Sequence, residues 1–389
     1  MNFEYITKNG VETVAPDMHG VMSEPFVPFS VRCPSFVELN DGTIVYFFCV
    51  KYHSQDDEAP GCGALVRSLD GGKTWGDMRL LRYDGAPCGG GNPIYDAVND
   101  TIVVLARSRH WRPGCEQDHI LNENDQLAGR TYERFYVTKS CDGGLSWTDY
   151  KEIEIEGIPS HWTVQTCPTP GAGIQLKNQK DPTKNGRLVM PSNRAELIDG
   201  KNAFRAHLVL SDDFGDTWRV GALEDFIGAN ESIIVELSDG TLVYNCRNQG
   251  GDPPSLRIQS YSNDGGETLF GNGVVETLYD PICHSGIAQV TYNGKEYIFY
   301  TAPTGEIPAS ADHLWGRREM LGLYVSCDGG ETYKLIKVLS PKGEFAAYSA
   351  LLATRDGNLL CAWETGPVYG EYRDIKYTSL DIGELIKLI

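Results

Sequence analysis

Five copies of one eight-residue pattern, Ser-x-Asp-x-Gly-x-Thr-Trp or a close variant, constrain the fold of this 389-residue chain more than any other feature. They read SLDGGKTW, SCDGGLSW, SDDFGDTW, SNDGGETL and SCDGGETY and begin at Ser68, Ser140, Ser211, Ser262 and Ser326. Successive copies start 72, 71, 51 and 64 residues apart, which is too long for a helical solenoid repeat and suits a four-stranded sheet. The spacing therefore predicts an all-β fold, a β-propeller.

Each copy has the chemistry of a tight turn. An Asp carboxylate accepts hydrogen bonds from turn amides, and glycine adopts a positive φ without steric cost. The aromatic residue that ends four of the copies (Trp75, Trp147, Trp218 and Tyr333) is large enough to pack between neighbouring sheets. We therefore interpret these copies, called Asp boxes below, as turns that stabilise the fold and not as ligand sites.

A second series of patterns gives the number of blades. Short hairpin patterns with a polar residue, a turn residue and an apolar run are centred on Gly42, Asp100, Gly186, Gly240, Gly294 and Gly357. Five of them are followed by an Asp box and the last by the C-terminus, so the sequence predicts a six-bladed propeller. Because no blade can bury its faces alone, we expect residues 1–389 to form one domain, with residues 1–30 closing the ring or covering one face. The polar stretch from Arg107 to Arg130 is expected to be a loop over one face.

Composition excludes several classes of partner. The formal net charge of −19 argues against nucleic acid and anionic membranes, both of which require a basic face. No apolar run is long enough for a membrane span, and the start MNFEYITKNG lacks the features of a signal peptide. Eleven cysteines without paired spacing fit a reducing compartment, so we expect a cytoplasmic location.

The sequence contains no recognisable metal or cofactor motif. Cys-x-x-Cys, His-Glu-x-x-His and phosphate-loop patterns are absent, and the GGGN at residues 89–92 lacks the helix and Lys that phosphate binding requires. His53, His110, His161 and His284 are candidates to face a pocket, although solvated or packed histidines are commoner. We therefore expect no metal and no cofactor.

Three arginines stand at the ends of predicted inner strands, where the loops of a propeller converge over its central channel. They are Arg32 in SVRCPSF, Arg247 in LVYNCRNQ and Arg318 in GRREMLGLY, from the predicted blades one, four and five. A guanidinium presents a planar fork of donors that matches a carboxylate. We expect the three to surround the channel axis and to bind a ligand that carries a carboxylate.

The sequences around these arginines resemble the sialidase (neuraminidase) superfamily of glycoside hydrolases, in its bacterial form. Arg-Cys-Pro at Arg32 is similar to the family's Arg-Ile-Pro, Asn-Cys-Arg ending at Arg247 is similar to its Asn-x-Arg, and Arg318 resembles the third arginine of its triad. The resemblance extends to Glu364, which resembles the carboxylate that holds the first arginine. It implies a retaining exo-glycosidase that removes a terminal α-linked sialic acid, or a related nonulosonic acid, from a glycan.

The resemblance also implies the catalytic pair. FAAYSALLATRDG resembles the segment with the family's nucleophilic tyrosine, here Tyr348, and NESIIVELSDG resembles the segment with its glutamate base, here Glu231. The anomeric carbon of such a sugar carries a carboxylate, which would repel an Asp or Glu nucleophile 4 Å away by roughly 1–4 kcal/mol. A neutral phenol avoids this repulsion but is a poor nucleophile unless a base such as Glu231 takes its proton.

A glycosidase also needs an acid, which the family takes from the loop after the first hairpin. That loop reads KYHSQDDEAPGCG here, and its spacing favours Asp56 or Asp57 over Glu58 without choosing between the first two. An acid that works near neutral pH should lie in an apolar or acidic setting that raises its pKa.

The same region departs from the family at Cys49–Lys51, where relatives commonly have Glu-Gly-Arg or Asp-Gly-Arg. A thiol replaces a carboxylate and the single ammonium of Lys51 replaces a guanidinium fork, so recognition of the ring hydroxyls is in doubt. Lys51 remains a candidate substrate contact. Second-tier candidates are His161, Trp162, Asn193 and Arg194, with core packing an equal interpretation for Trp162.

Two other functions fit parts of these patterns. A non-catalytic Asp-box propeller that binds a glycan or a protein would keep the boxes but has no reason to keep Tyr348, Glu231 and three spaced arginines together. A trans-sialidase or a lyase would use the same pocket, and the sequence does not exclude either.

Overall fold

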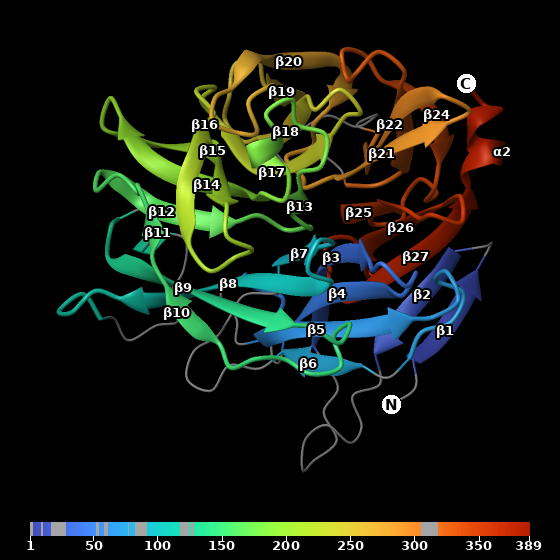
Figure 1. The fold of residues 1–389 in the computed structure, drawn as a ribbon, viewed down its shortest axis with the longest axis horizontal. Coiled ribbons are helices and arrows are strands. Elements are labelled where there is room, and N and C mark those ends of the chain that lie inside the picture. Colours follow the sequence, from blue (N-terminus) through green and yellow to red (C-terminus); the bar gives the residue numbers. More distant parts are fainter. Residues whose placement is uncertain are drawn as a thin grey trace.

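The chain folds as a ring of six sheets around a central channel (Figure 1). The computed structural model describes residues 3–8, 11–16, 29–51, 54–57, 61–76, 78–81, 92–116, 124–125, 128–304 and 318–389. Nearly all secondary structure in these residues is β-strand, and no helix among them is long and apolar enough to cross a bilayer. The prediction of an all-β, six-bladed propeller is confirmed.

The blades follow one another in chain order. Blade one has β3 (Ser30–Glu38), β4 (Ile44–Lys51), β5 (Gly61–Ser68) and β6 (Arg79–Leu81), and blade two has β7 (Asn92–Asp96), β8 (Thr101–Trp111), β9 (Thr131–Ser140) and β10 (Lys151–Ile153). Blade three has β11 (Ile155–Glu156), β12 (Trp162–Pro168), β13 (Ile174–Gln175), β14 (Leu188–Ile198), β15 (Lys201–Ser211) and β16 (Trp218–Leu223), with the 3₁₀ helix η1 (Pro182–Lys184) before β14. Blade four has β17 (Ala229–Glu236), β18 (Leu242–Asn248), β19 (Leu256–Ser262) and β20 (Phe270–Tyr279), and blade five has β21 (Gly286–Tyr292), β22 (Lys295–Pro303), β23 (Leu321–Ser326) and β24 (Lys334–Val338).

Blade six combines the two ends of the chain. It contains β25 (Ala347–Ala353), β26 (Asn358–Thr365) and β27 (Asp374–Asp381), followed by the short helix α2 (Ile382–Ile386). Strands β1 (Phe3–Lys8) and β2 (Val11–Pro16) extend this sheet, because β2 pairs with β27. The expectation for residues 1–30 also covers residues 17–28, which lie outside the described part of the chain.

All six predicted inner hairpins are present, and each connects the first two strands of a blade, or β13 and β14 in blade three. Gly42, in the first hairpin, has a φ of 87°, a backbone conformation that only glycine adopts easily. The hairpin without a glycine places Asp100 at a φ of 50° instead. Asp tolerates this region better than most residues, which explains how that turn forms.

The Asp boxes connect the last two strands of five blades, as their turn chemistry predicted. In the first box, Ser68 Oγ donates to Asp70 Oδ1 at 2.8 Å and accepts from the N–H of Gly72 at 2.8 Å. The other carboxylate contacts come from the N–H and hydroxyl of Thr74, at 2.8 and 2.6 Å. The box aromatics pack between blades: Trp218 is buried against residues of blades two and three. The role of the boxes is therefore structural.

One expected loop begins as strand. Strand β8 continues to Trp111 and pairs with the start of β9, so the segment from Arg107 to Arg130 begins as regular sheet. The cause is the alternation of side chains in RSRHW, which lets Arg109 pair with Glu133 across the ladder in a buried ion pair of 3.2 Å. Residues 117–123 and 126–127 of that segment lie outside the described part.

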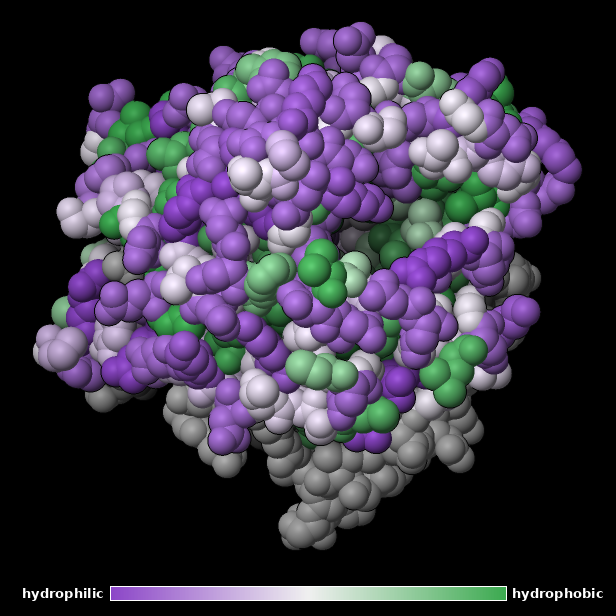
Figure 2. Space-filling model, viewed as in Figure 1, coloured by the Kyte–Doolittle hydropathy of each residue, from purple (hydrophilic) through white to green (hydrophobic). Residues whose placement is uncertain are grey.

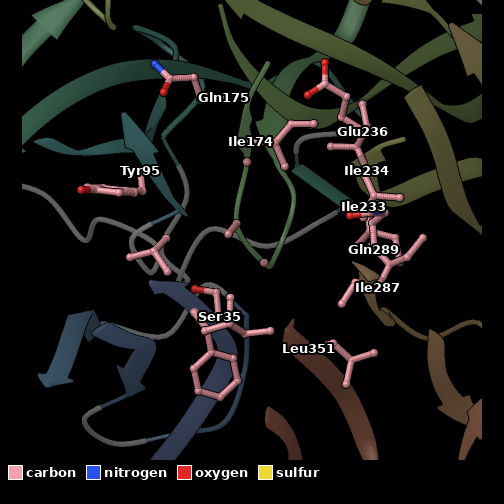
Figure 3. A pocket seen from close by; sticks show the side chains of 18 of the residues that line it. Ser35, Tyr95, Ile174, Gln175, Ile233, Ile234, Glu236, Ile287, Gln289 and Leu351 are labelled. Atoms are coloured by element: carbon pink, nitrogen blue, oxygen red, sulfur yellow. The ribbon is translucent and has the colours of Figure 1, made fainter. Parts of the chain in front are cut away.

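The inner strands enclose a cavity of about 720 Å³ in the channel. Figure 3 shows Ile174, Ile233, Ile287 and Leu351 on its wall, and the surface in Figure 2 is hollowed near the centre of the ring. His284 and Ser349 also line this cavity, whereas the described lining does not include Tyr348, Glu231 or the three arginines. The inner strands begin at one end of the channel, which is called the mouth below. From there they run along the cavity.

Candidate active site

Three inner strands contain a β-bulge close to the mouth. The pairing register shifts between Arg32 and Ser35 in β3, between Ala229 and Ser232 in β17, and between Ala347 and Ser349 in β25. A bulge leaves a residue unpaired and redirects its side chain, and bulges are frequent next to active sites. Glu231 and Tyr348 both lie within these irregular stretches, so the sheet itself provides a reason for their orientation.

Tyr348 is the centre of the site. Its hydroxyl donates to Glu231 Oε1 at 2.8 Å and accepts from Arg247 Nη1 at 2.9 Å. The same nitrogen of Arg247 donates to Glu231 Oε2 at 2.6 Å. The backbone φ of Tyr348 is 34°, a strained value for a non-glycine residue, and its N–H contacts Cys283 Sγ at 3.2 Å. A phenol, a carboxylate and a guanidinium therefore form a closed triangle of hydrogen bonds.

The other two arginines lie against the same phenol. The Cζ atoms of Arg32 and Arg318 are 5.2 and 5.6 Å from the centroid of the Tyr348 ring. The three arginine side chains come from blades one, four and five, and each residue is at most 8% exposed. The structure thus brings together the three arginines, Glu231 and Tyr348 as the sequence predicted.

Glu364, near the end of β26, fixes the first arginine. Its Oε1 atom accepts from Arg32 Nε at 3.2 Å and from the N–H of Cys33 at 2.7 Å. Glu364 is completely buried, and burial raises its pKa while the charge of Arg32 opposes that rise. Glu364 therefore has the position expected of a carboxylate that orients Arg32.

The structure distinguishes the two candidate acids. Asp57 Oδ1 accepts from Arg32 Nη1 at 2.9 Å, whereas the Asp56 carboxylate accepts from the hydroxyl of Ser54, two residues earlier in the same loop. Glu58 lies outside the described residues. Only Asp57 of the two described acids therefore contacts the arginine cluster.

The expected setting of the acid is not found. Loss of hydration raises the pKa of Asp57, but the charges of Arg32 and Lys51 lower it more, so that its pKa falls below the ordinary 3.8. The side chain is 82% exposed, and we therefore expect the arginine, rather than burial, to decide its protonation. In the free protein Asp57 is an ionised partner of Arg32, because the charges of Arg32 and Lys51 stabilise its carboxylate.

Lys51 supports the loop that carries Asp57. Its Nζ atom donates to the main-chain oxygen of Asp57 at 2.5 Å, and the residue is only 6% exposed. Cys49, two positions earlier on β4, is also buried. Lys51 remains a candidate substrate contact.

The described part of the site carries an excess of positive charge. Its cationic side chains are Arg32, Lys51, Arg247 and Arg318, and its carboxylates are Asp57, Glu231 and Glu364. The cationic side chains of this described set outnumber its carboxylates by one, in a protein whose net charge is −19. An anionic ligand would balance this local charge.

The pKa values of the central pair differ strongly. Burial raises the pKa of Glu231, but Arg247 outweighs that effect and holds it below the ordinary 4.5. Burial and the charge of Glu231 raise the pKa of Tyr348 well above 10, although the arginines oppose them. At neutral pH the site thus contains a neutral phenol donating to an ionised carboxylate, which is the arrangement a base-assisted nucleophile needs.

A buried histidine separates this pair from the channel cavity. His284 stacks on Tyr348 with ring centroids 5.9 Å apart, and burial lowers its pKa to about 3. It therefore stays neutral beside Glu231. The sequence marked His284 as one of four histidines that could face a pocket, and it does line the cavity.

Two residues of the site were missed by the sequence analysis. The Tyr372 ring lies under Arg32, with Cζ 4.1 Å from its centroid, and its hydroxyl accepts from Arg318 Nη1. Gln55 connects the loop of Asp57 to the segment of Tyr372, since its side chain accepts from the N–H of Tyr372 at 3.0 Å and donates to Gly370 O at 3.2 Å. The only available signal was a run of aromatic and charged residues, VYGEYR, after Glu364.

The second-tier candidates are placed in blade three. Trp162 is buried and packs against Arg194 and His207, so its packing interpretation is the one its contacts support. His161 is largely exposed and lies 3.4 Å from Glu196. Asn193 comes nearest to the site, because its amide donates to Asn230, the residue before Glu231.

The arrangement suits nucleophilic displacement at a carbon that carries a carboxylate. It combines a phenol hydrogen-bonded to a carboxylate, a second carboxylate on a separate loop and three guanidinium groups. Within the described residues, no three His, Cys, Asp or Glu side chains are grouped to hold a metal ion. The described site thus combines a phenol, carboxylates and guanidinium groups.

Comparison with known families identifies the superfamily of this chain. A family model described as BNR repeat-like domain matches residues 160–361, just over half of the chain. The sialidase of Micromonospora viridifaciens is 30% identical over 353 residues, covering 86% of this chain and 50% of that protein. This chain belongs to the sialidase superfamily. It spans about half the length of that relative.

Solved structures of sialidases share the fold. The Hadza microbial sialidase Hz136 superposes with a TM-score of 0.71 at 20% identity, over 91% of this chain and 66% of that one. The intramolecular trans-sialidase from Ruminococcus gnavus, solved in complex with oseltamivir carboxylate, superposes with a TM-score of 0.69 at 18% identity, over 91% of this chain and 95% of that one. Because both identities are low, these two superpositions establish only the fold of this chain.

Proposed function

We propose that the protein is a retaining exo-glycosidase that hydrolyses the bond between a terminal, α-linked sialic acid, or a closely related sugar acid, and a glycan. The observation that carries the proposal is the meeting of three arginines from separate blades around one phenol that is hydrogen-bonded to a glutamate. Membership of the sialidase superfamily and the relatives named sialidase support it.

In the proposed first step, Tyr348 attacks the anomeric carbon. Glu231 takes the phenol proton as the new carbon–oxygen bond forms, and the bond to the glycan breaks. Asp57, once protonated, gives its proton to the departing oxygen. Arg32, Arg247 and Arg318 hold the sugar carboxylate and neutralise its charge beside the reacting carbon.

In the second step, water replaces Tyr348 at the anomeric carbon. Asp57 accepts a proton from this water, and Glu231 returns its proton to the phenol oxygen as the bond to Tyr348 breaks. Two displacements on opposite faces leave the configuration of the sugar unchanged. The sugar acid is then released and each side chain regains its starting protonation.

Substrate binding provides a way to load the acid. The pKa of Asp57 is low in the free protein because of its contact with Arg32. A substrate carboxylate that takes over Arg32 removes this stabilising contact and adds a negative charge nearby, and both effects raise the pKa of Asp57. The acid would therefore be protonated most readily when the substrate is in place.

The decisive experiment combines product analysis with covalent trapping. The protein is incubated with an α-linked sialyl glycan and the products are followed by NMR, with release of the α-anomer expected first. Separately, a 2,3-difluoro sialic acid should add the mass of one sugar to the protein, at Tyr348.

The matched variant is Tyr348→Phe, which keeps the ring but lacks the hydroxyl. It should release no sugar and take no label. Release of the β-anomer first, or labelling of another residue, would refute the tyrosine mechanism. An anhydro, unsaturated or transferred product would show a transferase or lyase. Glycan binding without turnover in the unmodified protein would indicate a non-catalytic propeller.

A further inference from the structure

Tyr372 occupies a position between two of the three arginines. It lies in residues 366–373, which connect β26 to β27. The Cζ atom of Arg32 is 4.1 Å from its ring centroid, and Arg318 Nη1 donates to its hydroxyl. The ring also stands edge-on to Tyr348, at 6.4 Å and 84°. One side chain thus contacts two guanidinium groups and the proposed nucleophile.

The position of Tyr372 is fixed by its surroundings. Its N–H donates to the side chain of Gln55 at 3.0 Å, and its main-chain oxygen accepts from the hydroxyl of Ser30. Its ring packs edge-on against Phe345, with centroids 4.9 Å apart. The residue is nonetheless only partly buried. These contacts hold the side chain of Tyr372 in one position.

The hydroxyl of Tyr372 has a proton to offer. Its oxygen accepts from Arg318, and among the described residues its O–H group has no acceptor, so it can donate to a ligand. Burial raises the pKa of Tyr372, although the charges of the arginines oppose that rise, so the phenol keeps its proton at neutral pH. A neutral donor beside two cations attracts an anion without repelling it, whereas a carboxylate at this place would compete for the arginines.

We propose that Tyr372 is a fourth member of the group that binds the substrate carboxylate, with its ring stacked on Arg32 and its hydroxyl bridging Arg318 to a carboxylate oxygen. This inference rests on the proposed function for the identity of the ligand as a sugar acid. Tyr372 is thereby a specificity residue, which favours an anionic ligand over a neutral ligand of the same shape.

The test compares a ligand that carries the carboxylate charge with a neutral derivative of the same sugar. The probes are 2,3-unsaturated sialic acid and its methyl ester, and the readout is the ratio of their dissociation constants by calorimetry. Tyr372→Phe retains the ring over Arg32 but removes the hydroxyl, and we expect the preference for the acid to fall about 10-fold, as for one hydrogen bond to a charged group. In turnover assays KM should rise while kcat changes little, because the contact is present in both substrate and transition state.

Tyr369→Phe is the matched control. It removes a hydroxyl from the same segment, but that hydroxyl accepts from the main-chain N–H of Arg318, at 2.8 Å. Its ratio should equal that of the unmodified protein. An unchanged or increased preference for the acid in Tyr372→Phe overturns the inference, as does failure of the unmodified protein to prefer the acid.

The two proposals fail in different ways. If the unmodified protein releases sialic acid but Tyr372→Phe keeps the full preference, the inference about Tyr372 is wrong and the proposed function stands. If the preference depends on Tyr372 but no sialoside is cleaved, the carboxylate site is real and the proposed catalysis is wrong.

Discussion

Glu231 and Glu236 lie on the same strand, β17, yet their partners belong to different chemistry. Glu231, at the mouth, accepts from the guanidinium of Arg247 and the hydroxyl of Tyr348. Glu236, at the far end, accepts from the main-chain N–H groups of Lys177 and Asn178, at 2.9 and 3.0 Å. Glu231 therefore contacts a phenol with which it can exchange a proton. Glu236 instead connects two blades through main-chain N–H groups, which do not exchange protons in a reaction.

This difference separates the two ends of the channel. The amides around Glu236 belong to a neighbouring part of blade three and hold the sheets together, as the amides of the Asp boxes hold their turns. The partners of Glu231 come from other strands and blades and meet only at the mouth. Position along one strand, rather than residue type, therefore decides whether a carboxylate stabilises the fold or has the partners of a catalytic group.

The largest effect is expected for Glu231→Gln. Gln cannot take the phenol proton, so kcat should fall about 1,000-fold, within the range for a lost general base. In the unmodified protein, activity should fall as the pH drops through the pKa of Glu231, which lies below 4.5. Steady-state assays between pH 3 and 8, chosen to span that pKa, test both points.

The matched control for this variant is Glu236→Gln. It should lower the free energy of unfolding by roughly 1–3 kcal/mol and leave kcat unchanged, because it weakens only hydrogen bonds between blades. A similar loss of kcat in both variants would mean that the two ends of the channel do not differ in role.

The next effect is that of Asp57→Asn, which should depend on the leaving group. We expect kcat to fall about 100-fold for a sialyl lactose and much less for an aryl sialoside, whose leaving group needs little protonation. Asp56→Asn, one residue away, should behave like the unmodified protein because its carboxylate contacts Ser54. The opposite ranking of the two variants would assign the acid to Asp56.

The contact between Arg32 and Asp57 also predicts a pH effect. A low pKa in the free protein means that Asp57 is protonated only in acid, so kcat/KM should decrease as the pH rises. Bound substrate raises the pKa of Asp57, so the corresponding decrease in kcat should occur at a higher pH. Coincident decreases in pH–rate profiles of kcat and kcat/KM would argue against loading of the acid by the substrate.

A smaller effect, on the dissociation constant of a ligand, is expected for Arg32→Lys at the mouth. Arg187→Lys, in a structural ion pair, is its control. Arg32→Lys replaces a fork by a single ammonium, and the dissociation constant of 2,3-unsaturated sialic acid should rise about 10-fold. Arg187→Lys should leave that constant unchanged, because Arg187 contacts Asp212 and Glu267 in a network next to an Asp box. Isothermal calorimetry measures both, and equal losses would place Arg32 outside the binding site.

The fold was predictable because its signals are local. A Ser, an Asp and a Gly within one box make their hydrogen bonds to each other, so the sequence alone specifies each turn and its spacing counts the blades. The strand at Arg107–Trp111 was not predicted because its side chains are polar. A polar stretch can still form a strand when its charges pair with those of the neighbouring strand, as Arg109 and Glu133 do.

The site was predictable only where a motif identified its residues. The arginines, Glu231 and Tyr348 were found through their flanking sequences, and the structure places them together. The choice between Asp56 and Asp57 depends on which way a turn directs two adjacent side chains, which no pattern encodes. Tyr372 meets Arg32 through a connection without any repeat, so only coordinates reveal the contact.

The smallest effect is expected at an Asp box. Asp142 accepts from Ser140 Oγ at 2.8 Å and from the N–H groups of Leu145 and Ser146 at 3.0 and 2.9 Å. Asp142→Ala should lower the free energy of unfolding by about 1 kcal/mol and leave kcat unchanged. Asp149→Ala, an exposed residue nearby in the same blade, is the control and should change neither quantity.

The pH dependence of unfolding extends this test. Burial raises the pKa of Asp142, but the hydrogen bonds from Ser146 and Ser140 outweigh it, so that its pKa is about 2 against an ordinary 3.8. A pKa lowered by folding adds stability above pH 3.8 that is lost as the pH falls toward 2. Thermal melts of Asp142→Ala should therefore show a smaller loss of stability in that interval than melts of the unmodified protein. An identical loss in both would mean that this box, unlike the carboxylates at the mouth, has no measurable energetic role.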